Sequence, residues 1–160
     1  TMMFGVGESL ADRIAHLDAI RSLQDETGVF TAFIPWPYQP GNTALGGSAA
    51  GGHDYLRTLA VSRLYLDNFD NVQASWVTQG PQIAQLALDY GANDIGSTMI
   101  EENVVAAAGV SHQMEERELI ALIHATGRDA AQRSTLYERI RLHPRKEEAP
   151  AEDRGCRVQN

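Results

Sequence analysis

The sequence predicts an α/β fold, half of a TIM-like (β/α) barrel, with four parallel strands, covering helices and extra helices at the C-terminal end. Short apolar, β-branched runs alternate with segments of helical periodicity across short connections, which is typical of a parallel sheet covered by helices. A complete eight-unit barrel needs about 250 residues, whereas this chain holds four units in 160 residues. An open doubly wound sheet has the same periodicity, but the string Gly5-Val6-Gly7-Glu8 lacks the third glycine of a dinucleotide-binding turn, which favours the barrel.

The predicted strands and helices alternate along the chain. We expect strands at residues 1–5, 30–34, 72–77 and 95–100, and helices at residues 9–28, 54–67, 80–91, 103–108, 115–126 and 129–142. Residues 1–142 form the barrel half in this prediction, and residues 143–160 form a disordered, charged tail. Because the chain opens inside a strand, we expect it to have been cut from a longer polypeptide.

Capping residues and prolines set the bounds of these elements. Ser9 followed by Asp12 is typical of a helix N-terminus, and Gly28 ends the same helix. Pro35 and the next proline end the second strand, because proline has no N–H to donate to a ladder. Pro81 stands at the first position of a later helix, where its missing N–H costs nothing. The longest loop covers residues 39–52, and loops of that length are often functional.

Composition argues against several classes of partner. The formal net charge is −8 and the 13 Lys and Arg are scattered, so we expect neither nucleic acid nor an anionic membrane as a partner. No apolar run reaches the roughly 18 residues of a membrane span, and we expect a cytoplasmic protein. The single cysteine, Cys156, predicts no disulfide and no cysteine-based metal site. The histidines share no metal-ligand spacing, so we expect no metal site from them either; they are His16, His53, His112, His124 and His143.

Candidate site residues follow from the parallel topology. Ligands of parallel β/α folds approach the carboxyl ends of the strands, so the four loops there should meet at one pocket. The candidates are Gly5, Gly7 and Glu8 after the first strand, Trp36, Gln39 and Asn42 after the second, Ser75, Trp76, Thr78 and Gln79 after the third, and Glu101, Glu102 and Asn103 after the fourth.

Structural roles compete with functional ones at these positions. Glu8 precedes a helix cap, where a carboxylate favours the helix N-terminus electrostatically. Trp36 and Trp76 fit the core better than a platform for a ligand. Adjacent carboxylates point in different directions, so at most one of Glu101 and Glu102 faces a pocket. The residues by themselves assign no catalytic group.

Three longer strings resemble one known group of enzymes. They are QDETGVFTAFIPWPYQPGNT at residues 24–43, the run from YLRTLAVSRLYL to NVVAAAG at residues 55–109, and AAQRSTLY at residues 130–137. They resemble the C-terminal half of radical S-adenosylmethionine enzymes of the futalosine (menaquinone) pathway and of deazaflavin synthesis. TMMFGVGE at residues 1–8 resembles the strand-five motif of those barrels, although Thr1 stands where many members have glycine. Trp36 and the string IGSTM at residues 95–99 are most similar to cyclic dehypoxanthinylfutalosine synthase.

The resemblance implies a radical cyclisation. A reduced 4Fe-4S cluster would cleave S-adenosylmethionine, and the resulting radical would start the cyclisation of dehypoxanthine futalosine, with flavodoxin or ferredoxin as electron donor. Gly5 and Glu8 are then the expected cofactor contacts. The expected substrate contacts are Gln39, Ser75, Gln79 and Glu101. The Cys-x3-Cys-x2-Cys cluster motif of the family would lie upstream of residue 1, so the chain alone is expected to be inactive.

Two alternatives remain open at this point. The chain resembles, less closely, the aminofutalosine synthase and the deazaflavin (FO) synthase subunit, and turnover by the full-length protein separates these from the cyclase. A non-enzymatic β/α interaction module is the other alternative. A three-cysteine loop encoded upstream of Thr1 would support an enzyme, and its absence would favour the module.

Overall fold

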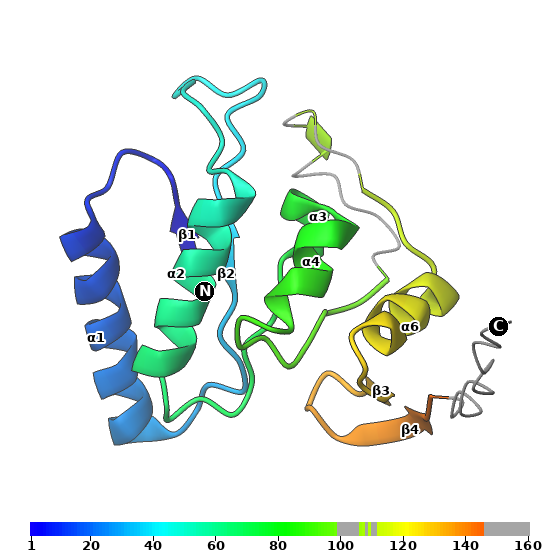
Figure 1. Ribbon diagram of the computed structural model, residues 1–160. Helices are drawn as coiled ribbons and strands as arrows, with labels where there is room; N and C mark the ends of the chain where they lie inside the picture. Colours follow the sequence, from blue (N-terminus) through cyan, green and yellow to red (C-terminus); the bar gives the residue numbers. More distant parts are fainter. Residues whose placement is uncertain (99–105, 108, 110–111, 146–160) are drawn as a thin grey trace, which may run out of the picture.

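The computed structural model describes residues 1–98, 106–107, 109 and 112–145. Its N-terminal part is a short parallel sheet packed against two helices (Figure 1). Strand β1 (Met2–Phe4) pairs in parallel with β2 (Pro35–Pro37). Two isolated parallel bridges, Phe33 with Val72 and Gln73 with Asp94, extend the same order. The structure is therefore mixed α/β, but only two of the four predicted parallel strands are formed as strands among the described residues.

Prolines explain why the sheet is interrupted, and they correct the predicted strand 30–34. On one edge of this segment, Ile34 accepts the Met2 N–H at 3.1 Å and Tyr38 donates to the Phe4 carbonyl at 2.8 Å. On the other edge, Phe33 exchanges hydrogen bonds with the 71–73 segment. Pro35 and Pro37 follow at the positions that would continue that second edge, where they have no N–H to give. The prolines thus belong to the strand and end only its pairing with the third segment.

The predicted third and fourth strands are shortened. The expectation of a strand across 72–77 is wrong, because only residues 72 and 73 form isolated parallel bridges and α3 (Trp76–Gln79) begins three residues later. In the fourth segment Asp94 makes the parallel bridge, and residues 95–98 are not in a strand. Residues 99 and 100 lie outside the described part of the chain.

Helices α1 (Leu10–Thr27) and α2 (Gly52–Tyr65) lie side by side, and α2 lies in front of β1 and β2 (Figure 1). The predicted capping of α1 is confirmed: Ser9 and Asp12 form a capping box, and Gly28 ends the helix at a φ of 61°. Helix α2 begins at Gly52, earlier than expected, and α4 (Pro81–Ala87) starts with its proline as predicted. The predicted helix at 115–126 is confirmed as α6 (Glu116–Ala125).

The predicted helix at 129–142 is wrong, because these residues form an antiparallel hairpin of β3 (Ala130–Arg133) and β4 (Arg139–His143). The Ser134 hydroxyl accepts the N–H groups of Leu136 and Glu138 at 3.1 and 3.2 Å. A serine that bonds nearby backbone in this way competes with helical hydrogen bonds. Tyr137 completes the turn with a φ of 64°, which a helix does not allow. Most of the predicted helix 103–108 and the predicted tail at 146–160 lie outside the described residues.

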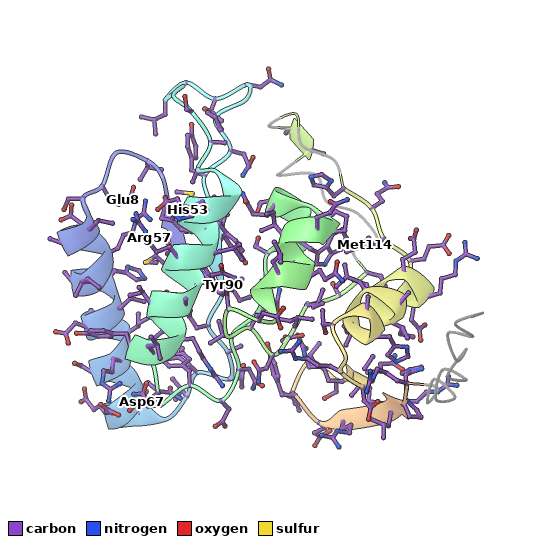
Figure 2. The ribbon with its side chains drawn as sticks, in the orientation of Figure 1. Glu8, His53, Arg57, Asp67, Tyr90 and Met114 are labelled. Atoms are coloured by element: carbon purple, nitrogen blue, oxygen red, sulfur yellow. The ribbon has the colours of Figure 1, made fainter. Side chains whose placement is uncertain are left out.

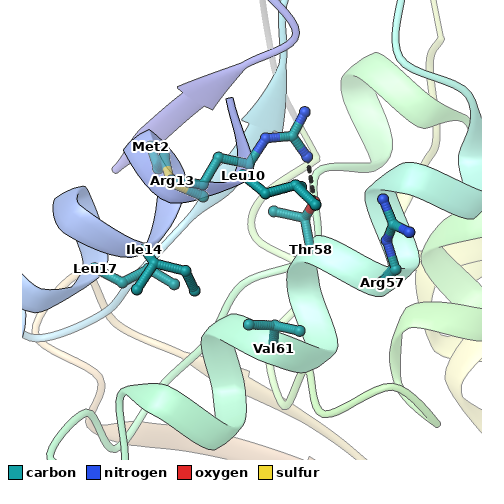
Figure 3. Close-up of a pocket in the computed structure, with 8 residues that line it drawn as sticks. All are labelled: Met2, Leu10, Arg13, Ile14, Leu17, Arg57, Thr58 and Val61. Atoms are coloured by element: carbon teal, nitrogen blue, oxygen red, sulfur yellow. Dashed lines mark hydrogen bonds between the residues drawn. The ribbon is translucent and has the colours of Figure 1, made fainter. Parts of the chain in front are cut away.

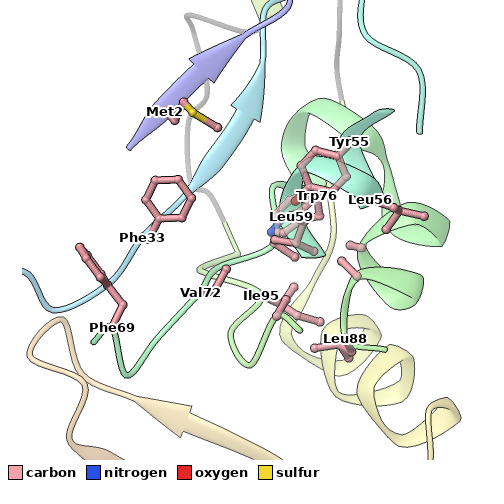
Figure 4. Packing of buried hydrophobic residues seen from close by; sticks show 14 of the residues in the cluster. Met2, Phe33, Tyr55, Leu56, Leu59, Phe69, Val72, Trp76, Leu88 and Ile95 are labelled. Carbon is pink, nitrogen blue, oxygen red and sulfur yellow. The ribbon is translucent and has the colours of Figure 1, made fainter. Parts of the chain in front are cut away.

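The core lies between the parallel segments and the helices α2 and α4 (Figure 4). Residues 33, 35, 37 and 39 are buried, whereas 32, 34, 36 and 38 are only half buried. This alternation shows that one face of the second segment is packed and the other is left partly open. Phe33, Val72 and Trp76 are at most 2% exposed at the centre of the packed side.

Candidate functional site

The loop after β1 is organised around the carboxylate of Glu8. Its Oε1 accepts the Gly5 N–H at 2.7 Å and its Oε2 accepts the Val6 N–H at 2.8 Å. Gly5 and Gly7 have φ values of 88° and 105°, which only glycine adopts readily. Gly5 and Glu8, both predicted to follow the first strand, therefore share one turn, and Glu8 stabilises that turn.

Glu8 also pairs with Arg13, which the sequence analysis did not identify as a candidate. The Arg13 Nε donates to Glu8 Oε1 at 2.8 Å. The same guanidinium donates to both oxygens of Asp54, at 3.2 and 3.1 Å, and to the Thr58 hydroxyl at 2.8 Å. Arg13 and Asp54 are 41 residues apart, so no local pattern links them. Figure 2 places Glu8 at the upper end of the molecule, with Asp67 at the lower end.

The protonation state of Glu8 follows from these contacts. Burial raises the pKa of Glu8, but the N–H groups of Gly5, Glu8 and Val6 and the Arg13 guanidinium outweigh that effect and lower the pKa to about 2. Glu8 is therefore a carboxylate at neutral pH, suited to accept hydrogen bonds and unsuited to donate a proton.

Glu8→Gln should reduce stability only where the carboxylate is ionised. Because the folded pKa lies below the ordinary value of 4.5, the Glu8 contribution is complete above the unfolded pKa and is lost as pH falls toward 2. Urea unfolding should thus show a gap between wild type and Glu8→Gln at pH 7 that closes between pH 5 and about pH 2. Glu26→Gln, at an exposed position of α1, is the control. A gap independent of pH would contradict this account.

The end of loop 38–51 meets the loops that follow β1 and α3. A Cβ on Gly5 would stand 3.4 Å from the Ala50 Cβ, and the Gln79 side chain donates to the Ala50 carbonyl at 3.4 Å. Gly5 and Gln79, predicted as cofactor and substrate contacts, thus both approach Ala50. Asn42 of the same loop donates to the Ala107 carbonyl at 3.1 Å.

Two of the other predicted substrate contacts, Gln39 and Ser75, are buried and hydrogen-bonded to groups of the protein itself. Gln39 is 8% exposed and donates to the Pro37 carbonyl at 3.1 Å. The Ser75 hydroxyl pairs with that of Thr78 at 2.8 Å. The Ser75 N–H donates to the Tyr55 hydroxyl at 2.7 Å, and burial raises the pKa of that tyrosine to about 12. Glu101 lies outside the described residues.

A cavity of about 280 Å³ lies between α1 and α2 (Figure 3), and one of its lining residues, Arg13, binds Glu8 of the loop after β1. Its lining is mostly apolar and includes none of the predicted site residues; it consists of Met2, Leu10, Arg13, Ile14, Leu17, Arg57, Thr58 and Val61. This hollow faces the helices, whereas ligands of parallel β/α folds sit at the strand ends. We therefore base the candidate site on the loops at the strand ends.

A second charged cluster lies at the opposite end of the parallel segments. Asp94 Oδ2 accepts Arg133 Nε at 3.0 Å and the Tyr137 hydroxyl at 3.0 Å. Asp94 Oδ1 accepts the Gly96 N–H at 2.9 Å, and the Arg133 guanidinium lies 3.9 Å from the centre of the Tyr137 ring. The sequence missed this cluster because it assigned residues 129–142 to a helix. The cluster fixes the hairpin to the fourth parallel segment.

These features define a class: a mixed α/β chain with helix-covered parallel segments and polar loops gathered at their carboxyl ends. The chain belongs to the family described as the CofH/MqnC C-terminal region, whose model matches residues 27–146. The resemblance inferred from the sequence is thereby confirmed.

Curated relatives carry related names. The chain is 51% identical over 150 residues to a cyclic dehypoxanthine futalosine synthase of Halalkalibacterium halodurans. The matched region is 93% of the chain and 40% of the relative. It is 48% identical to the protein of that name from Streptomyces coelicolor, over 96% of the chain and 39% of the relative. An aminodeoxyfutalosine synthase of Thermus thermophilus is 42% identical, over 92% of the chain and 41% of the relative. The chain thus spans about two fifths of the length of these relatives.

Two features are absent from the described part of the chain. Within the described ranges, no group of three or more His, Cys, Asp or Glu side chains could hold a metal ion. The same residues include no helix with the length and apolar character needed to cross a lipid bilayer.

Proposed function

We propose that this chain is the C-terminal portion of a radical S-adenosylmethionine enzyme that cyclises dehypoxanthine futalosine. The observation that carries the proposal is the identity of 51% and 48% to two cyclic dehypoxanthine futalosine synthases across nearly the whole chain. The identity to the aminodeoxyfutalosine synthase is lower, at 42%. A complete barrel in the full-length protein would add strands beside β1 and on the far side of the fourth parallel segment, and would enclose the partly open face.

The residues of this chain suit one of the two implied cofactors, S-adenosylmethionine, better than the other, the 4Fe-4S cluster. Cys156 is the sole cysteine and lies outside the described residues, so the described part offers no thiolate to a 4Fe-4S cluster. The loop after β1 would leave room for the nucleoside part of S-adenosylmethionine, because a Cβ on Gly7 would meet no atom within 4 Å. When bound, S-adenosylmethionine would supply the hydrogen-abstracting chemistry.

The roles of this chain's residues are to bind and to orient. Gly5 and Gly7 would let the cofactor approach the backbone, and Glu8 would hold their turn in place through the Gly5 and Val6 N–H groups. The proposed substrate contacts are Gln39, Ser75, Gln79 and Glu101. Such positioning is the main contribution of a protein to cofactor chemistry of this kind. An electron donor such as flavodoxin or ferredoxin, and a cytoplasmic location, belong to the same proposal.

Turnover by the full-length protein tests the proposal. After anaerobic reconstitution of the cluster, we expect deoxyadenosine release and cyclised product from dehypoxanthine futalosine. Cleavage of S-adenosylmethionine without cyclised product would instead favour a relative with a different substrate, such as the aminodeoxyfutalosine synthase. Absence of both deoxyadenosine and cluster absorbance would favour a non-enzymatic interaction module. The 160-residue chain alone, expected to form no cluster, is the control.

A further inference from the structure

We propose that Arg13 is a positioning residue that locks the turn after β1 to the start of α2. The inference rests on the proposed function, because these two segments would border the cofactor. It concerns a residue that contacts no expected ligand directly and acts through Glu8 and Asp54.

The contacts of Arg13 use all three guanidinium nitrogens. Nε binds Glu8, Nη1 binds Asp54 and Thr58, and Nη2 binds Asp54. The side chain is 12% exposed, and its guanidinium carbon lies 4.5 Å from the centre of the Phe4 ring. Figure 3 shows Arg13 extending from α1 to Thr58 of α2. An arginine held by a planar fork in this way has one orientation, which a lysine ammonium does not reproduce.

The two acidic partners of Arg13 lie in different segments of the chain. Glu8 organises the turn of Gly5 to Val6, as described above. Asp54 lies in the first turn of α2, directly after loop 38–51, whose last residue but one, Ala50, stands against Gly5. Both sides of the Gly5–Ala50 contact are therefore tied to one guanidinium. Movement of the turn after β1 away from the start of α2 requires breaking a charge-assisted hydrogen bond between Arg13 and either Glu8 or Asp54.

A second ion pair provides a comparison within the same protein. Arg21 of α1 donates to Asp67 and to the Tyr65 carbonyl at the other end of α2, and its side chain is 32% exposed. Arg21 thus joins the same two parts of the chain far from the strand-end loops. If Arg13 only held α1 to α2, loss of Arg21 should have similar consequences.

The test compares Arg13→Gln, Arg13→Lys and Asp54→Asn with Arg21→Gln in the full-length, cluster-reconstituted protein. Arg13→Gln should raise the KM for S-adenosylmethionine by about tenfold or more, since small misplacements of binding groups carry such penalties. Arg13→Lys should recover part of the loss, because it keeps a charge beside Glu8. Asp54→Asn weakens the anchor on α2 while the Arg13–Glu8 pair remains, and should show the same direction of change. Arg21→Gln should stay within about twofold of wild type.

Hydrogen exchange gives a second readout that does not depend on activity. Backbone exchange in residues 5–9 and 50–56 should increase in Arg13→Gln and not in Arg21→Gln. If wild type cleaves S-adenosylmethionine and Arg13→Gln behaves like Arg21→Gln in both KM and hydrogen exchange, the positioning role is refuted. If wild type does not cleave it, the proposed function fails, and the exchange pattern still decides whether Arg13 locks the loops. Should Arg13→Gln not fold, Arg13→Lys and Asp54→Asn carry the same comparison.

Discussion

Trp76→Ala should lower the free energy of unfolding by about 3–5 kcal/mol, the range for removing a large aromatic side chain from a packed core. Trp76 is 2% exposed and lies in the cluster beneath α2 and α4 (Figure 4). Trp76 is also the first residue of α3, the short helix found where the end of the third strand was predicted. Urea denaturation measures the loss directly.

Leu64→Ala is the matched control for that substitution. Leu64 is 83% exposed on α2, so its removal should change the free energy of unfolding by no more than about 0.5 kcal/mol. Equal losses in the two variants would mean that the core does not lie where the structure places it.

Asp94→Ala should cost about 3 kcal/mol, because it leaves Arg133 and Tyr137 without their shared acceptor. The Asp94 side chain is 10% exposed and joins the hairpin to the fourth parallel segment. The measurements are urea unfolding and limited proteolysis of residues 126–139, which should be cut faster in the variant. Burial and then the charge of Asp94 raise the pKa of Tyr137 to about 12, so spectroscopic titration should find a lower tyrosine pKa in Asp94→Ala.

Asp89→Ala separates this effect from the loss of any aspartate. Asp89 pairs with Arg128 at 2.8 Å, but its side chain is 58% exposed. Exposed ion pairs contribute between zero and about 1 kcal/mol, so the control should be mild and its hairpin should resist proteolysis like wild type. Matching proteolysis in the two variants would exclude Asp94 as the anchor of the hairpin.

The sequence predicted which candidate residues lie together only where they are close in the chain. Gly5 and Glu8 are three residues apart and share one turn, so the string itself placed them together. Arg13 and Asp54 escaped notice because their partnership spans 41 residues and depends on how α1 packs on α2. Ala50 escaped notice because an alanine carries no chemical signal. Its importance comes from its neighbours, Gly5 and Gln79.

The sequence by itself determined the capped helix α1, the proline start of α4, the parallel order of the segments and the family, since all of these depend on residues close in the chain or on identity of strings. Only the tertiary structure decided how far the sheet extends and that residues 129–142 form a hairpin instead of a helix. Prolines at 35 and 37 withhold donors from one particular edge, and which edge that is depends on the neighbouring segment. Asp94 supplies a buried partner for Arg133 and Tyr137, and that distant carboxylate, together with the Ser134 turn, outweighs the helical propensity of their own segment.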